Sequence, residues 1–305
     1  MTIREYKRVE SLEEAWELNQ KKANRVIGGM IWLKMSRGNV GTAIDISGLG
    51  LDQIEETEDA FEIGAMVTLR QLEEHPGLAA YTDGAMRESV RHIVGVQLRN
   101  LATVGGSIYG RFGFSDVLTM FLAMDTEVEL YKAGRMPLVE FAKQIGGRDI
   151  LVKLIVHKDK AVYHYQSVRN TQTDFPVLTC AAAKRADGAY RFSIGARPGR
   201  AVLFEASAET IQALIEEKQK AETKADADAD TREKQDKTQT GKKAACLAKW
   251  ICDQVRTSSN MRGSAEYRKH LTGVLIKRAV RVLEEKGMRS AVIEASKACV
   301  KKGRE

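Results

Sequence analysis

Two glycine-centred segments are the parts of the sequence best suited to bind a charged ligand. One is Arg25-Val-Ile-Gly-Gly-Met-Ile-Trp, and the other is Thr103-Val-Gly-Gly-Ser-Ile-Tyr-Gly, which is followed by Ser115 and Asp116. Loops of this kind present successive backbone N–H groups to one concavity, which binds pyrophosphate without any side-chain charge. A single glycine pair is more often a tight turn. Two pairs, followed by an acid at a helix start, favour a nucleotide site.

Side chains of the second segment add polar groups to this predicted site. Thr103 and Ser107 supply hydroxyl donors, and Asp116 is placed to accept a hydrogen bond from a sugar hydroxyl. The common phosphate-binding patterns are missing, because there is no GxxxxGK[ST] run and Gly48-Leu-Gly lacks the third glycine of a Rossmann fingerprint. The predicted site is therefore neither a Rossmann site nor a P-loop.

The cysteines and histidines indicate that this chain carries no metal centre. The five histidines show no metal-ligand spacing, and the four cysteines form no CxxC pair. An iron–sulfur cluster needs several converging thiolates, usually announced by short spacings. We therefore expect reduced, buried thiols at Cys180, Cys246, Cys252 and Cys299.

Length and composition fit a globular protein with room for two domains and a small third element. The chain has 305 residues, of which 43% are hydrophobic. The longest apolar runs, such as residues 117–124, are too short to cross a bilayer, and the charged N-terminus lacks the apolar core of a signal peptide. We therefore expect a cytoplasmic protein without a membrane partner.

The net charge of +7 invites a nucleic-acid interpretation, but its distribution argues against one. Lys and Arg total 48 against 41 acidic residues. The excess is concentrated in residues 242–304, on expected helical faces without interleaved aromatic side chains. A solvated or partner-facing surface is the better interpretation.

The elements around the first glycine segment predict a small βαβ-type layer over residues 1 to about 55. Ser11 is placed to cap a helix, with Glu14 completing a capping box. Strands are expected at residues 24–27 and 42–46, and an edge strand at 60–64.

The rest of the chain predicts short helices, then strands, then longer helices. Thr68 and Gln71 cap one helix, residues 83–94 are helical, and Ser115 caps a further helix after the second glycine segment. The expected strands are 128–131, 150–156, 161–168, 177–183 and 190–194, the last two joined in a hairpin at 186–188. Residues 216–243 carry no large apolar side chain, which favours a solvated helical extension fading into a mobile linker. The expected later helices are 244–256, 264–285 and 290–301.

Several segments in the right order resemble the FAD-binding (medium) subunits of the xanthine dehydrogenase and carbon monoxide dehydrogenase family of molybdenum hydroxylases. Arg99-Asn-Leu-Ala-Thr-Val-Gly-Gly-Ser, with Ser115, Asp116 and the apolar run to Asp125, is similar to that family's second flavin loop. The first glycine segment resembles its first loop, AGGTDL. Further similar segments are residues 43–46, 63–69, 167–174 and 261–271. The resemblance thus spans nearly the whole chain.

The resemblance implies an α+β protein, with a vanillyl-alcohol-oxidase/PCMH-type FAD-binding domain of two α/β subdomains and a C-terminal α+β domain. The expected bounds are 1–55 and 56–165 for the subdomains and 166–305 for the C-terminal domain, which includes a low-complexity charged linker at about 218–241. FAD would lie between the subdomains, with its pyrophosphate on the glycine loops and its flavin facing the later strands.

The same resemblance implies cofactor-binding residues by their position in the family pattern. Ile93 and Leu151 would pack near the flavin ring. Tyr165 falls where xanthine-oxidising relatives often have a lysine near the N1–C2=O edge of the flavin. The first loop would contribute Val26, Ile27, Gly28, Gly29, Met30 and Ile31. The second would contribute Thr103, Gly105, Gly106, Ser107, Tyr109, Gly110, Ser115 and Asp116.

Three departures from the family pattern affect these expectations. Met30 and Ile31 replace the usual Thr and Asp, so backbone donors must suffice in the first loop. Ser107 replaces Asn and is a smaller donor. Tyr165 can donate only a neutral hydrogen bond, whereas a lysine would stabilise the anionic reduced flavin. The departures bear on the flavin potential and the electron acceptor more than on FAD binding.

The resemblance implies a flavin-dependent oxidoreductase subunit that transfers electrons and needs no catalytic acid or base of its own. Its partners would be an iron–sulfur subunit and a molybdopterin-binding large subunit, and its acceptor a molecule such as NAD. Two alternatives stay open. One is a self-contained flavin oxidoreductase of the same fold, and the other is a degenerate non-catalytic scaffold or nucleic-acid-binding protein.

Overall fold

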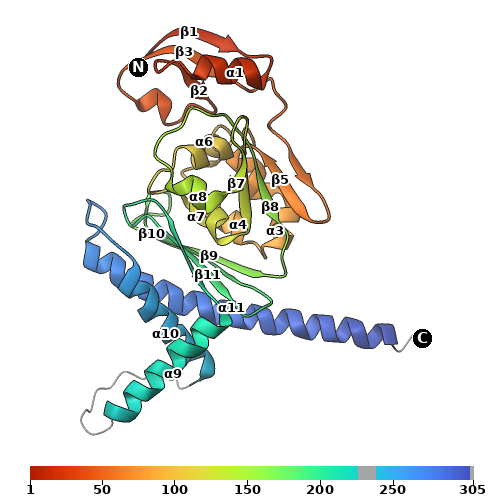
Figure 1. Cartoon of the computed structure of the whole chain (residues 1–305), viewed down its shortest axis with the longest axis vertical. Helices are drawn as coiled ribbons and strands as arrows, with labels where there is room; N and C mark the ends of the chain where they lie inside the picture. The colour runs from red at the N-terminus through yellow and green to blue at the C-terminus, as the bar shows by residue number, and fades with distance from the viewer. Residues whose placement is uncertain (226–237, 303–305) are drawn as a thin grey trace.

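The computed structural model describes residues 1–225 and 238–302, with side chains for residues 1–220 and 238–289. In this part of the chain three sheets follow one another along the long axis of the molecule (Figure 1). The N-terminal sheet lies at one end and the C-terminal helices lie at the other. Short helices and largely antiparallel sheets together confirm the predicted α+β class.

The first layer is a parallel sheet with a helix packed on it. Its strand order is β1 (Thr2–Arg8), β3 (Asn39–Asp45), β2 (Arg25–Ile27), and α1 (Leu12–Asn19) connects β1 to β2. Ser11 accepts a hydrogen bond from the Glu14 amide at 3.1 Å. The Glu14 carboxylate accepts from the amide of Glu10 rather than from that of Ser11, so the capping box is displaced by one residue. The predicted βαβ-type layer is therefore present.

The second layer is an antiparallel sheet flanked by short helices. Its strand order is β4 (Ile54–Glu56), β5 (Ala60–Gly64), β8 (Leu151–His157), β6 (Thr126–Leu130), β7 (Gly134–Pro137). The helices are α2 (Leu69–Glu74), α3 (Pro76–Tyr81), α4 (Ala85–Val90), α5 (Val96–Arg99), α6 (Val104–Tyr109), α7 (Asp116–Ala123) and α8 (Leu138–Lys143). A 3-10 turn, η1 (Leu33–Met35), precedes them in the chain, between β2 and β3 of the first layer. The capping box of Thr68 and Gln71 at α2 is present as predicted. This layer holds the largest hydrophobic core of the described residues.

The third layer is an antiparallel sheet with helices on both faces. Its strand order is β12 (Val202–Ala206), β11 (Tyr190–Gly195), β10 (Pro176–Lys184), β9 (Val162–Arg169). α7 packs on one face of β10 and β11, while α10 (Gln239–Gln254) and α11 (Ala265–Lys302) pack with the other face, and α9 (Ala208–Ala225) packs on α10. Because both of its faces are covered, β10 is buried over nearly its whole length.

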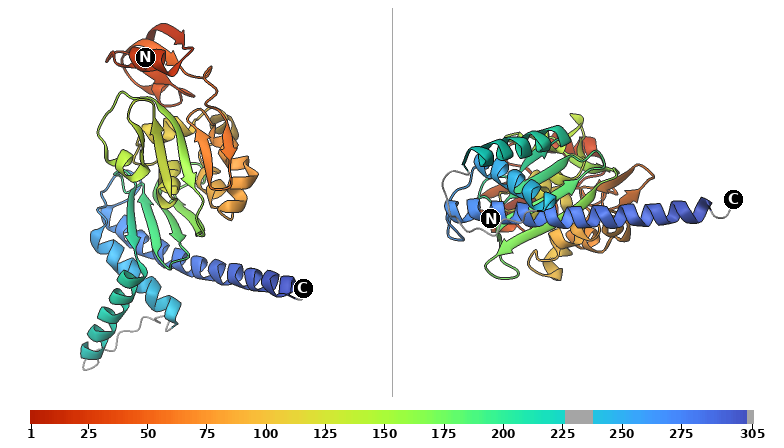
Figure 2. Two further views of the ribbon diagram at one scale, coloured as in Figure 1. Left: turned by 45° about the vertical axis from the view of Figure 1, so that its right-hand side comes forward. Right: turned by 90° about the horizontal axis from the view of Figure 1, so that it is seen from below.

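The C-terminal helices differ from the sequence-based expectation. The separate helices predicted at 264–285 and 290–301 are one helix, α11, which continues through Gly287. A single interior glycine costs a helix only about 1 kcal/mol, which the surrounding helix-forming residues offset. The later part of α11 extends away from the body of the molecule (Figure 2).

The predicted linker needs correction at its C-terminal end, whereas the helical extension expected at its start is present. α9 is helical to Ala225, and α10 begins at Gln239, capped by Thr238. Gly241 is buried in the α10 packing. The middle of the predicted linker, residues 226–237, lies outside the described residues.

The sheets change along the chain near the domain boundaries expected from the sequence. The first sheet ends at Asp45 and the second begins at Ile54. The second ends at His157 and the third begins at Val162. Whether these layers fold as separate domains stays a prediction. Among the described helices, none is long and apolar enough to cross a membrane.

Candidate functional site

The two glycine segments lie against one another. A Cβ at Gly28 would be 2.6 Å from the hydroxyl oxygen of Thr103, and a Cβ at Gly29 would be 1.7 Å from the carbonyl oxygen of Leu101. Only a residue without a side chain allows the backbones to approach this closely. The structure therefore brings together the two segments that the sequence singled out.

The first segment presents free backbone donors. None of the amides of residues 29–32 donates a hydrogen bond to a described residue. Met30 has a φ of 57°, in the left-handed region that a non-glycine residue rarely adopts. Successive amides around such a residue converge to form an anion-binding concavity. The unpaired amides and the left-handed Met30 are the features of this segment that suit an anion, and Met30 and Ile31 offer no polar side chain.

The second segment does not present the row of free amides that the sequence predicts. The amide of Val104 donates to the Val67 carbonyl and that of Gly105 to the Ala65 carbonyl, both at 2.8 Å. The amide of Gly106 donates to the hydroxyl of Thr103 at 3.1 Å. Ser107 donates both its amide and its hydroxyl to the Thr103 carbonyl. These groups build the first turn of α6 and are already paired.

The two glycines of the second segment therefore have different roles: Gly105 allows close packing, and Gly106 leaves open space beside the backbone. A Cβ at Gly105 would be 2.6 Å from the Ala65 carbonyl oxygen, so Gly105 allows α6 to approach the end of β5. A Cβ at Gly106 would meet only the Thr103 hydroxyl, at 3.1 Å, and otherwise open space. Gly106 is exposed, and the space beside it is large enough for an approaching group.

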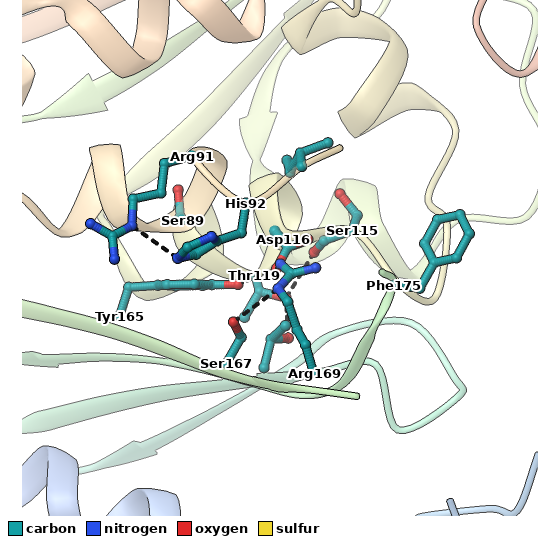
Figure 3. Close-up of polar contacts among 12 residues, drawn as sticks. Ser89, Arg91, His92, Ser115, Asp116, Thr119, Tyr165, Ser167, Arg169 and Phe175 are labelled. Atoms are coloured by element: carbon teal, nitrogen blue, oxygen red, sulfur yellow. Dashed lines mark hydrogen bonds and ion pairs between the residues drawn. The ribbon is translucent and has the colours of Figure 1, made fainter. Parts of the chain in front are cut away.

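Asp116, at the start of α7, is enclosed by two partners from β9. The Tyr165 hydroxyl and the Arg169 guanidinium each donate to the same oxygen, Oδ1 of Asp116, at 2.5 Å. Burial raises the pKa of Asp116, against the opposing effect of Arg169. Burial and the neighbouring Asp116 also raise the pKa of Tyr165. Figure 3 shows both side chains directed at Asp116. A sugar hydroxyl that donates to Asp116, as the sequence predicts, would therefore compete with these two hydrogen bonds.

The remaining predicted cofactor-binding residues have mainly packing or capping contacts. Ser115 caps α7 by accepting from the Leu118 amide at 3.0 Å. Ile93 is half-buried and Leu151 is buried against the core of the second layer. Tyr109 packs on Phe141, with ring centroids 5.9 Å apart, and Gly110 is held close to the ring of Phe112. In the first segment, Val26 and Ile27 form part of β2, and Ile27 is buried.

A cavity of about 780 Å³ lies beside Tyr165, between α4 and β9. Of the predicted cofactor-binding residues, Tyr165 alone lines this cavity. Arg91 and His92, which follow α4, face Tyr165 across it (Figure 3). The full lining is Asp83, Gly84, Ala85, Arg87, Glu88, Arg91, His92, His164, Tyr165, Gln166, Ser167, Arg169, Gln172 and Lys286. The sequence did not predict this cavity, because its residues are distant in the chain and follow no motif.

The cavity is cationic at neutral pH. Burial, with a smaller effect of Lys286, lowers the pKa of His164 to about 4, and burial followed by Arg91 lowers that of His92. Both rings are therefore neutral. Most of the lining cations are paired with acids, but Arg87 makes no hydrogen bond or ion pair with any described side chain.

The family model for the FAD binding domain in molybdopterin dehydrogenase matches residues 2–158, just over half of the chain. The chain belongs to this family. Its cofactor is FAD. The match includes both glycine segments, Asp116 and Leu151, and it ends before Tyr165 and Arg169.

Full-length similarities extend beyond the matched region. Protein YgfM of Escherichia coli K12 is 22% identical over 278 residues, which cover 90% of this chain and 94% of YgfM. The structure is similar to that of quinoline 2-oxidoreductase from Pseudomonas putida 86, with a TM-score of 0.74, 17% identity and coverage of 93% of this chain and 98% of the other. For carbon monoxide dehydrogenase from Hydrogenophaga pseudoflava the TM-score is 0.72, with 20% identity and coverage of 92% and 97%. At these identities the similarity shows the fold, and it confirms the expected type of FAD-binding fold.

The residues present fit FAD. The unpaired amides of residues 29–32 provide donors for pyrophosphate, and the open side of Gly106 leaves room for a phosphate nearby. No side chain of the first segment supplies a charge, so the fit depends on the backbone.

Proposed function

We propose that this FAD-binding subunit transfers electrons within a molybdenum hydroxylase complex. The observation that carries the proposal is the run of unpaired amides at residues 29–32, held against the second glycine segment by the contact of Gly29 with Leu101. When bound there, FAD supplies the chemistry that links one-electron and two-electron transfer. The chain's own residues bind the cofactor, orient it and set the charge around it.

The observed geometry supports the proposed cofactor contacts. The amides of residues 29–32 hold the pyrophosphate, and Gly106 leaves space for it. Tyr165 and Arg169 hold the buried Asp116 in one orientation beside the expected path of the sugar chain. The cavity next to Tyr165 gives the flavin edge access to a second molecule.

The proposed electron donors are partner subunits. Among the described residues no group of histidine, cysteine and acidic side chains is arranged to hold a metal ion. Burial raises the pKa of Cys180 to about 12, so this thiol is protonated at neutral pH. We infer that electrons arrive from an iron–sulfur subunit, which receives them from a molybdopterin-binding large subunit.

An anionic dinucleotide such as NAD is the proposed acceptor. Arg87 lines the cavity beside Tyr165 without an acidic partner among the described residues, so it is available to a phosphate. The side chain of Tyr165 is committed to Asp116 and supplies no positive charge. Acceptor recognition in this proposal therefore depends on the arginines of the cavity.

Anaerobic stopped-flow spectroscopy tests the electron-transfer role. The flavin absorbance is followed after substrate of the large subunit is added either to the complex, co-expressed with its neighbouring genes, or to the isolated chain. Bleaching in the complex alone supports the proposal. Rapid bleaching of the isolated chain would favour a self-contained flavin oxidoreductase, and a chain that purifies without flavin and cannot be reconstituted would favour a degenerate scaffold.

A further inference from the structure

Four aromatic side chains gather where the two glycine segments meet. Trp32 ends the first segment, Phe112 and Phe114 follow the second, and Phe175 precedes β10. The Trp32 ring lies 5.7 Å from Phe112, 5.0 Å from Phe114 and 5.5 Å from Phe175, measured between centroids. Phe112 and Phe114 are stacked, with 9° between their planes. We call these four residues the aromatic cluster.

The aromatic cluster is separate from the three hydrophobic cores found among the described residues. Trp32 is 39% exposed, and the other three rings are half-buried. Large aromatic side chains usually fill a core, because each buries a large apolar area. A partly exposed group of them beside a polar site marks a surface that binds a ligand or a partner.

One side of the cluster is closed by protein. The Arg262 guanidinium lies 4.9 Å from the centroid of Phe175 and is held by Asp174 at 3.1 Å. A Cβ at Gly113 would be 2.3 Å from the carbonyl oxygen of Pro198, so the backbone between Phe112 and Phe114 is fixed against the third layer. The exposed side is therefore that of Trp32, which carries the last of the free amides.

We propose that Trp32, Phe112 and Phe114 form a stacking platform for a heteroaromatic ring of FAD. The inference rests on the proposed binding of pyrophosphate at residues 29–32. In a dinucleotide each ring is joined to the pyrophosphate through one sugar unit, so a ring must lie near Trp32, which carries the last of these amides. Aromatic side chains stack on adenine and on isoalloxazine alike, because both present a planar π-face.

Two different environments, one on each side of Asp116, are available for the two rings of the dinucleotide. Phe175 and Tyr165 lie on opposite sides of Asp116 in Figure 3. The cavity beside Tyr165 is polar and cationic, whereas the aromatic cluster is apolar. One ring therefore stacks on Trp32 while the other extends toward Tyr165.

Calorimetric titration of the cofactor-free full-length chain with FAD, ADP and FMN tests the platform. Trp32→Leu removes the π-face and keeps an apolar side chain, while Trp32→Phe keeps a smaller π-face. We expect Trp32→Leu to weaken FAD binding about 5- to 150-fold, the range for loss of one stacked base, and Trp32→Phe to recover most of it. Met35→Ala is the matched control, because Met35 is a 60% exposed apolar residue of the same turn outside the aromatic cluster.

The ADP and FMN titrations identify the stacked ring. Weaker ADP binding with unchanged FMN binding assigns adenine to the platform and leaves the flavin beside Tyr165. Weaker FMN binding with unchanged ADP binding assigns isoalloxazine, which supports the platform and contradicts the proposed place of the flavin beside Tyr165. Unchanged FAD affinity in Trp32→Leu overturns it, and so does an equal loss in Trp32→Leu and Trp32→Phe with a matching fall in melting temperature, because that result indicates packing alone. A wild-type chain that fails to bind FAD overturns the proposed function itself.

Discussion

Gly29 and Leu101 are in direct backbone contact, with the Cβ position of Gly29 only 1.7 Å from the Leu101 carbonyl oxygen. The contact joins the first layer to the second beside the unpaired amides of residues 29–32. Any side chain at Gly29 must push the two segments apart. The geometry of the candidate site thus depends on the absence of a side chain at Gly29.

Substitution of Gly29 by alanine should lower both stability and FAD binding. The added methyl group overlaps a backbone carbonyl that cannot rotate away, and overpacking of this kind costs about 1–3 kcal/mol. Denaturant unfolding of the cofactor-free chain measures the first effect, and acid-released FAD per chain measures the second. Full stability in Gly29→Ala would show that the segments are not in contact in solution.

Substitution of Gly106 by valine should remove FAD while leaving the chain folded. A Cβ there meets open space apart from the Thr103 hydroxyl, so the fold tolerates it, but a branched side chain occupies the phosphate's approach. Flavin content and circular dichroism are measured on the same sample. Full flavin occupancy in a folded Gly106→Val chain would place the cofactor away from the second segment.

Asp116→Asn should destabilise the chain more than Tyr165→Phe. Loss of the carboxylate leaves the Arg169 guanidinium buried without a counter-charge, which costs about 3–5 kcal/mol. Loss of the Tyr165 hydroxyl removes one hydrogen bond to a charged group, worth about 1.5–3 kcal/mol. Because both substitutions act on the same carboxylate, the double variant should lose less than the sum of the two. Additive losses in urea unfolding would show that the two side chains act independently.

Acid should destabilise the third layer through Glu284. Burial opposes ionisation of Glu284, but hydrogen bonds from Lys184, Lys243 and Tyr190 hold its pKa at about 2. The unfolded value is near 4.5. The stabilisation is therefore complete above about pH 5 and is lost as pH falls toward 2.

Glu284→Gln should flatten this part of the pH–stability profile. We expect a loss of about 1–2 kcal/mol at neutral pH, less than the full pKa difference implies because solvent screens the cluster. Glu205→Gln is the control, because Glu205 pairs with Arg191 at an exposed position. Unfolding free energies at pH 3, 5 and 7 distinguish the variants, and equal pH profiles for Glu284→Gln and the wild type would contradict the expectation.

Replacement of residues 226–237 by a short Gly/Ser linker should leave flavin content and melting temperature unchanged. The composition of this stretch offers no apolar surface to bury. Extending the replacement through residue 241 should lower the melting temperature, because Thr238 caps α10 and Gly241 is buried. Equal effects of the two replacements would contradict the assigned start of α10.

The sequence predicted those helices whose N-cap side chain accepts a hydrogen bond from an amide only three residues later, because such a pair is visible as a short motif. Ser11, Thr68 and Ser115 cap the helices that the sequence assigns to them. Strands with an apolar, covered face, such as β5 and β10, were also predicted. The expected edge position of β5 was wrong, because β5 pairs with β4 on one side and with β8 on the other. β1 was missed because its side chains are mostly exposed and charged, so no alternation reveals it.

Long-range contacts could not be predicted from spacing. The glycine pairs identified both segments, but pairing of the second segment's amides with Ala65 and Val67 depends on the position of β5. The Tyr165–Asp116 hydrogen bond joins residues 49 positions apart. The aromatic cluster likewise combines residues from three regions of the chain, none of which forms a motif by itself.

The helix α7 has consequences for how this protein can be divided. It begins at Asp116, and one side lies in the core of the second layer while the other packs on β10 and β11. Thr119 bonds Thr179 at 3.0 Å across this second contact, and a Cβ at Gly195 would be 2.2 Å from the Thr119 hydroxyl oxygen. A fragment that stops at residue 158, where the family match ends, would expose an apolar helix face to water. In evolution the smallest exchangeable module should therefore carry the cofactor segments and the C-terminal sheet together.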